Sequence, residues 1–260
     1  VIPIAKPVTF YPYGSYRRRI RVINTSSNHA EAGLEDDFHY FTVSLAHDGS
    51  VLTDITATAI RWPWDTCASA NVPLRNLIGM SISSRCLAAG EVSSPALQCT
   101  HMFDLAGLAI AHVGRSFAPG YQRQYDIEIP YGMDKNKTVT CNRDGKTVLS
   151  WDLADRECVS PPPYSQAPWR GGFLKWADSN LDADDAEAAI VLRRACDIGM
   201  GRGMDLDAIE RAEDLSGLMS GVCFTMQPEQ IVIARRQPDT IRNFDDDPDA
   251  LLAEGPSPQI

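Results

Sequence analysis

The sequence predicts an α+β protein in which an antiparallel sheet of hairpins is packed by helices, with further helices added toward the C-terminus. Two Asp-Gly pairs, at 48–49 and 144–145, each lie between runs that alternate apolar and polar residues, which is the strongest short-range signal of a β-hairpin. One apolar segment, residues 99–113, has helical spacing instead. The three prolines at 161–163 can continue neither a strand ladder nor a helix, and the composition changes to helix formers after them.

The first 160 residues are expected to form the sheet and the helices that cover it. A turn-rich stretch at 24–33 separates the first strand from the hairpin that begins at Phe38. The expected strands are 16–23, two or three antiparallel strands from Phe38 around the first Asp-Gly turn, 125–129, and the two sides of the second Asp-Gly turn. A short helix fits residues 71–80, and a longer helix begins near Cys99.

The last 100 residues are expected to be mainly helical. Ser179, three residues before Asp182, predicts a capping box for a helix over 182–199, which the glycines that follow would end. A second helix over 205–220 and a strand over 231–236 follow, and the acidic, proline-bearing segment from 244 is expected to be a loose surface tail. We therefore divide the chain into a core (1–160), a helical extension (161–224) and a strand with an acidic tail (225–260).

Charge and composition exclude several classes of function. The 260 residues include 24 basic and 34 acidic side chains, so the net charge of -10 disfavours binding to nucleic acid. The longest apolar stretch, at 105–113, is far shorter than the roughly 20 residues that cross a membrane. Neither a secretion signal at Val1 nor a CxxC pair among the seven cysteines is present, which predicts reduced thiols and a cytoplasmic protein. A homo-oligomer is compatible with this composition.

The acidic run before the first hairpin is the first candidate for chemistry. In the run at 35–39, three acids precede His39. Because side chains alternate along a strand, Asp37 and His39 are expected to share one face, where the carboxylate would orient the imidazole as a general base. A solvated acidic turn is an equally good interpretation of Glu35 and Asp36.

Aromatic residues and a thiol follow the hairpin. Trp62 and Trp64 lie close to Cys67 in the sequence, and two indole rings there would wall a pocket for a planar ligand. Core packing is the commoner role for a single tryptophan. Arg61, next to them, is a candidate partner for a phenolate oxygen.

The start of the long helix carries the third candidate cluster. Cys99 at the helix N-terminus would feel the positive end of the helix dipole and become more thiolate-like. His101 and Asp104 are neighbours on the helix surface and within reach of a hydrogen bond. We expect His39 and His101 to face one pocket, because the helix should pack on the sheet. We expect the other cysteines to be unpaired and chemically quiet; these are Cys86, Cys141, Cys158, Cys196 and Cys223.

Three runs carry a resemblance to a known family. The segments LEDDFHYF, PWDTC and QCTHMFDLA resemble the signature segments of the bacterial domain-of-unknown-function family 2889, over residues 16–244. That resemblance implies a genomic context of aromatic and lignin degradation. A second resemblance concerns the order of elements, which is similar to NifU-like iron–sulfur scaffold proteins and implies a NifU/SufE-like core. Cys67 and Cys99 would match two of that family's ligands, but its third cysteine has no counterpart here and His101 follows Cys99 rather than preceding it.

The chemistry expected from these features is that of a cofactor-independent lyase or isomerase. The concrete form is a lyase that releases formaldehyde from a lignin-derived phenolic aromatic by retro-aldol chemistry. No Gly-rich phosphate loop, HExxH or P-loop lysine is present in the sequence, and no metal is required for such a reaction. The expected catalytic residues are Asp37, His39, His101 and Arg61, and the expected substrate-binding residues are Trp62, Trp64, Cys67, Cys99 and Asp104. The alternatives are a metal-binding or iron–sulfur accessory protein that uses Cys67, Cys99 and His101, and a non-catalytic partner in a catabolic complex.

Overall fold

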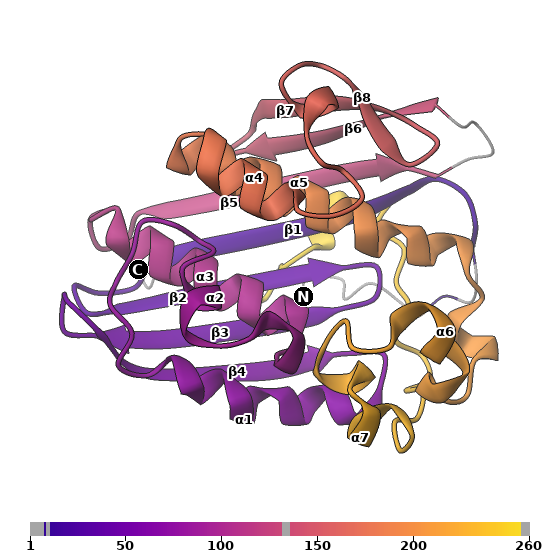
Figure 1. The fold of residues 1–260 in the computed structure, drawn as a ribbon, viewed down its shortest axis with the longest axis horizontal. Helices are drawn as coiled ribbons and strands as arrows, with labels where there is room; N and C mark the ends of the chain where they lie inside the picture. Colours follow the sequence, from indigo (N-terminus) through magenta and orange to yellow (C-terminus); the bar gives the residue numbers. More distant parts are fainter. Residues whose placement is uncertain (1–7, 9–10, 132–135, 256–260) are drawn as a thin grey trace.

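The fold is built on one antiparallel sheet of eight strands in the order β4-β3-β2-β1-β5-β6-β7-β8 (Figure 1). A computed structural model of the chain describes residues 8, 11–131 and 136–255. The strands are β1 (Ser15–Asn24), β2 (His29–Asp36), β3 (Tyr40–His47), β4 (Leu52–Arg61), β5 (Gln122–Pro130), β6 (Asn136–Arg143), β7 (Lys146–Ala154) and β8 (Glu157–Ser160). Together with the helices, this sheet confirms the α+β class.

Both Asp-Gly turns are confirmed. The first joins β3 to β4 and the second joins β6 to β7, with Gly49 and Gly145 at positive φ angles of 96° and 78°. These are backbone conformations that glycine adopts without steric cost. The turn predicted at 24–33 is shorter than expected, because β2 begins at His29. Its alternate residues Ala30, Ala32 and Leu34 are buried in the core.

The helices of the described residues are α1 (Asn71–Leu74), α2 (Ala89–Val92), α3 (Thr100–Gly114), α4 (Phe173–Asn180), α5 (Ala183–Gly199), α6 (Ser216–Met219) and α7 (Pro228–Ile231). The longer helices cover one face of the sheet, whereas α6 and α7 lie beside it (Figure 1). Helix α3, which the sequence predicts, packs on β1, β2 and β3, and α5 packs on β5, β6 and β7. The N-terminus of α3 therefore lies over the strands that carry the acidic run.

Three expectations for the C-terminal half are wrong. Ser179 lies inside α4, and Asp182 caps α5 instead, because its side chain accepts hydrogen bonds from the amides of residues 184 and 185. The expected helix over 205–220 consists of short 3-10 turns and α6. The strand expected over 231–236 does not form. These residues include the end of α7 and take part in two isolated β-bridges.

The described part of the acidic tail is also packed, which contradicts the expectation of a loose segment. Leu251 and Leu252 are buried, and their carbonyl oxygens accept hydrogen bonds from Arg19 and Arg21 of β1. Because Arg19 and Arg21 alternate with the core residue Ile20, this tail lies on the face of the sheet opposite α3 (Figure 1). Residues 256–260 of the expected tail are outside the described part.

The packed tail predicts a stability effect far from the helices. Replacing Leu251, which is 3% exposed, by alanine is expected to lower the free energy of unfolding by about 2–4 kcal/mol, because it leaves a cavity under the sheet. The matched Leu218→Ala variant, at a site 80% exposed, should change it by less than about 0.5 kcal/mol. Denaturant unfolding of both variants checks this, and equal stabilities would show that the tail does not contribute.

One main hydrophobic core draws buried residues from Tyr11 to Ile241, so it spans all three expected segments. The segment boundaries at 160 and 224 stay predictions. Within the described residues, no helix combines the length and the apolar character that crossing a bilayer requires.

Candidate active site

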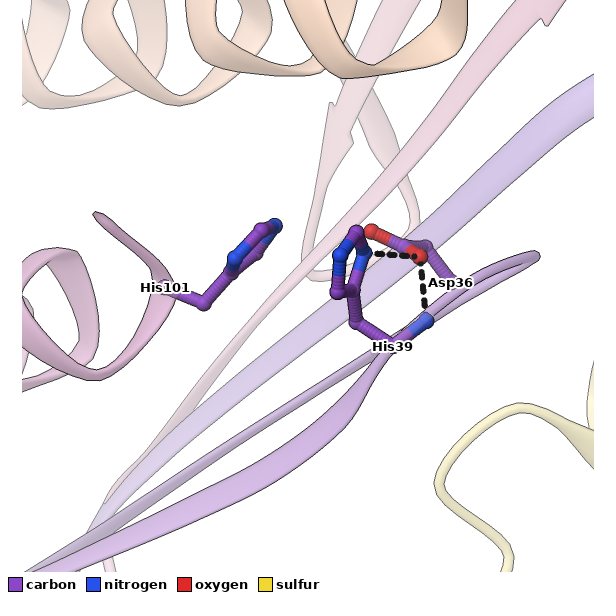
Figure 2. A group of neighbouring side chains, drawn as sticks. All are labelled: Asp36, His39 and His101. Carbon is purple, nitrogen blue, oxygen red and sulfur yellow. Dashed lines mark hydrogen bonds and ion pairs between the residues drawn. The ribbon is translucent and has the colours of Figure 1, made fainter. Parts of the chain in front are cut away.

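The tight turn between β2 and β3 positions the first two residues of the site. The amide of Asp36 donates to the carbonyl oxygen of His39 at 2.9 Å, so Asp37 and Phe38 are the two central residues of the hairpin. The Asp36 carboxylate also accepts from the amides of Phe38 and His39, both at 2.8 Å. This side-chain-to-backbone capping is typical of aspartate in turns. It holds Asp36 and His39 beside each other (Figure 2).

Asp37 is not the partner of His39, and that prediction is wrong. The alternation rule on which it depended does not apply, because the chain reverses at Asp37 instead of continuing as a strand. The Asp37 carboxylate forms a fully buried ion pair with Arg202, with 2.5 Å between Oδ2 and Nη1. Burial raises the pKa of Asp37 to about 7, although Arg202 opposes this shift. Asp37 thus ties the turn to the segment after α5.

Asp36 and His39 form a buried dyad. Asp36 Oδ1 lies 3.0 Å from His39 Nδ1. Burial alone would raise the pKa of Asp36, but His39 and Arg18 outweigh it and hold that pKa well below its usual range. An ionised carboxylate only accepts hydrogen bonds, so Nδ1 of His39 carries the proton and Nε2 has the free lone pair. Burial also lowers the pKa of His39, which keeps the ring neutral near pH 7.

His101 completes the group from the first turn of α3, and the prediction that the two histidines meet is confirmed. The rings of His39 and His101 stack with centroids 3.9 Å apart and planes 30° apart (Figure 2). Burial and the neighbouring His39 lower the pKa of His101 well below its usual value. The ring of Phe41 stacks on His101 at 5.6 Å between centroids. The site therefore holds two neutral imidazoles in contact.

Tyr16 and Arg18 of β1 belong to the site and were not among the expected residues. Arg18 lies directly opposite Asp36 in the β1–β2 pairing. Its Nε and Nη2 lie 3.0 and 2.6 Å from Asp36 Oδ2, which also accepts from the Tyr16 hydroxyl at 2.7 Å. The alternation of side chains along β1 could have indicated this role for Arg18. Residues 16, 18, 20 and 22 share the core face of β1, and an arginine on an apolar face needs a buried partner.

Arg61 holds the turn rather than facing the histidine pair. Its guanidinium donates to the Glu35 carboxylate at 3.0 Å. It also donates to four backbone carbonyl oxygens, those of Asp36, Asp37, His39 and Thr240. These acceptors use both terminal nitrogens, so the geometry gives Arg61 a structural role and leaves it no clear access to a phenolate.

Asp104 makes no hydrogen bond to His101. Its carboxylate pairs with Arg194 of α5, at 3.1 Å between Oδ2 and Nε. Burial raises the pKa of Asp104. Asp104, Arg194 and Arg18 line a small cavity of about 20 Å³ behind the site. That volume is sufficient for roughly one water molecule, so Asp104 does not contact a substrate-sized space there.

The tryptophans and cysteines of the expected pocket lie in different surroundings. Trp64 belongs to a second, smaller hydrophobic cluster, whereas Trp62 packs against the main core. Cys67 contacts the Thr225 hydroxyl at 3.4 Å, and burial raises its pKa to about 12. Burial likewise raises the pKa of Cys99, so the expected activation by the helix dipole does not occur. All seven cysteines are described and free, which confirms the prediction of unpaired thiols.

The donor set is better suited to proton transfer than to a metal ion. Among the described residues, Asp36, His39 and His101 form one group of three potential metal ligands, whose ligand atoms lie within 4.8 Å of one another. Each oxygen of Asp36 already accepts three hydrogen bonds, from residues 16, 18, 38 and 39. The Arg18 guanidinium lies 3.2 Å from His101 Nε2, where a bound cation would be repelled. Cys67 and Cys99 are not part of this group.

Comparison with known proteins adds no further assignment. The sequence matches no known protein-family model, and no curated protein matches it. The chemistry of the site is therefore inferred from its geometry and its residues.

Proposed function

We propose that this protein is a cofactor-independent lyase that releases formaldehyde from a lignin-derived phenolic aromatic carrying a hydroxymethyl group. The observation that carries the proposal is the Asp36–His39 dyad stacked on His101. A histidine oriented by a buried carboxylate is a general base, and a second neutral imidazole beside it supplies a proton donor. His39 Nε2 and His101 Nδ1 make no hydrogen bond to another described residue, so both atoms are available to a substrate.

The reaction uses these two atoms in sequence. His101 Nδ1 gives its proton to a benzylic hydroxyl, which leaves as water, while the phenolic proton passes to His39 Nε2 and a quinone methide forms. Transfer of that proton from His39 to His101 restores both neutral imidazoles. His39 Nε2 then takes the proton of the hydroxymethyl O–H, the adjacent carbon–carbon bond breaks, and its electron pair reduces the quinone methide to a phenolate. One water, one formaldehyde and an alkenyl phenol leave. Transfer of the proton from His39 to the phenolate restores the neutral imidazole, and no external oxidant or reductant is consumed.

The aromatic, lignin-derived character of the substrate is proposed from the resemblance of three segments to family 2889, which no family model confirms. The rings of Phe38 and Phe41 flank the histidine pair, with centroids 6.2 and 6.0 Å from His39. Both rings are buried, at 4% and 0% exposed, so they hold the histidine rings in place from within the core. The His39 side chain is 11% exposed, so substrate would reach the pair from that side.

A direct assay separates this proposal from the metal-binding or NifU-like accessory alternative. The full-length protein is incubated with phenolic dimers that carry a hydroxymethyl group and a benzylic hydroxyl, and formaldehyde and alkene are quantified with and without a chelator. We expect equimolar formaldehyde and alkenyl phenol, with rates unchanged by the chelator. Copurification of about one equivalent of zinc or iron, with no formaldehyde from any dimer, would instead support the alternative.

A further inference from the structure

We infer that Arg18 determines which nitrogen of His101 carries the proton and so makes His101 the acid partner of His39; the catalytic part of this inference rests on the proposed function. Arg18 is a positioning residue, because it acts through His101 and Asp36. Its side chain is 2% exposed and lies between these two groups. The contact that matters is from Arg18 Nη2 to His101 Nε2 at 3.2 Å.

A guanidinium has five N–H donors and no lone pair at any working pH. The contact with His101 is therefore a hydrogen bond only if His101 Nε2 accepts. In a neutral imidazole that places the proton on Nδ1. The same Arg18 Nη2 lies 2.6 Å from Asp36 Oδ2, and Arg18 Nε lies 3.0 Å from it, so the guanidinium plane is fixed by the carboxylate.

The two histidines then present opposite groups. His39 donates through Nδ1 to Asp36 and keeps a lone pair on Nε2, which suits a base. His101 accepts at Nε2 from Arg18 and keeps an N–H at Nδ1, which suits an acid. With the other tautomer, His101 would direct an N–H toward the guanidinium and present a second lone pair. The pair would then hold two bases and no acid.

The surroundings of His101 also oppose a second proton on its ring. The charged or titratable groups that act on it are Arg18 of β1, His39 of the β2–β3 turn, Asp36 of β2 and Arg194 of α5. Only Asp36 favours the charged ring, and burial, His39 and the two arginines oppose it. Proton donation by His101 is therefore donation from a neutral imidazole.

The ¹⁵N NMR spectrum of histidine-labelled full-length protein at pH 7.5 tests this assignment directly. Protonated and unprotonated ring nitrogens of a neutral imidazole have well-separated resonances. We expect His39 and His101 both to carry the proton on Nδ1. A wild-type spectrum in which His101 carries its proton on Nε2 overturns the inference, whatever the behaviour of any variant.

The Arg18→Lys variant supplies the second readout, with Arg194→Lys as the matched control. A lysine keeps the positive charge and reaches Asp36, but its single ammonium does not span Asp36 and His101 as the guanidinium fork does. We expect His101 to shift toward the Nε2–H tautomer and kcat to fall by about 100-fold with little change in KM. Arg194 pairs with Asp104, so Arg194→Lys should leave the His101 tautomer unchanged.

The two readouts separate this inference from the proposed function. An unchanged His101 tautomer in folded Arg18→Lys contradicts the role of Arg18, even if turnover falls. If the wild-type protein shows the expected tautomers but releases no formaldehyde, the proposed lyase is overturned. The inference that Arg18 and Asp36 determine the two tautomers then still stands.

Discussion

The Asp36→Asn variant is expected to lose both turnover and stability. Asp36 is fully buried, and its oxygens accept from Tyr16, Arg18, Phe38 and His39. An asparagine replaces one acceptor oxygen by an NH₂ donor and removes the charge that balances buried Arg18. Leaving a buried charge without its partner costs about 3–5 kcal/mol. The orientation of His39 is lost as well, so we expect turnover to fall by about 100-fold or more.

Formaldehyde release and denaturant unfolding of the same preparation measure both effects. The matched control is Asp249→Asn, whose side chain is 96% exposed and which should change unfolding by less than about 0.5 kcal/mol. Normal turnover in Asp36→Asn would remove the dyad from the mechanism. An unchanged free energy of unfolding would contradict the buried charge network.

The His39→Gln variant is expected to reduce formaldehyde release by about 1000-fold while the protein stays folded. Glutamine is close in size and keeps the backbone amide that donates to Asp36, but it has no lone-pair nitrogen that accepts a proton near neutral pH. Loss of a general base costs about 10²–10⁴ in rate. His29→Gln is the matched control at an exposed position, and we expect it to retain wild-type turnover. A His39→Gln protein with wild-type turnover would assign the base to another residue.

The sequence was most informative where a local pattern determines the local structure. Two Asp-Gly turns predicted two hairpins, and helical spacing at 99–113 predicted α3. These two features predicted that His39 and His101 lie together, because a helix that packs on a hairpin places its first turn near the strand ends. Both elements depend on short-range rules of backbone geometry.

The sequence was least informative where a residue's role depends on distant contacts. Asp36 and Asp37 are neighbours, and only the position of the turn decides that Asp36 faces His39 while Asp37 meets Arg202, 165 residues away. Arg61 is held by carbonyl oxygens of the turn, which no side-chain pattern indicates. The tail at 244–255 is acidic enough to be expected in solvent, yet Leu251 is buried under the sheet.

The central claim is that His39 and His101 act as one acid–base pair, and a double-variant comparison tests it most directly. Formaldehyde release is measured for His39→Gln, His101→Gln and the double variant, each checked by melting temperature to be folded. Residues that act as a unit are strongly non-additive, so either single change should cost nearly as much as both together. We predict three rates within about tenfold of one another, all roughly 100-fold or more below wild type. A double variant whose loss of rate is the product of the two single losses, or a folded double variant with wild-type formaldehyde release, would contradict the account.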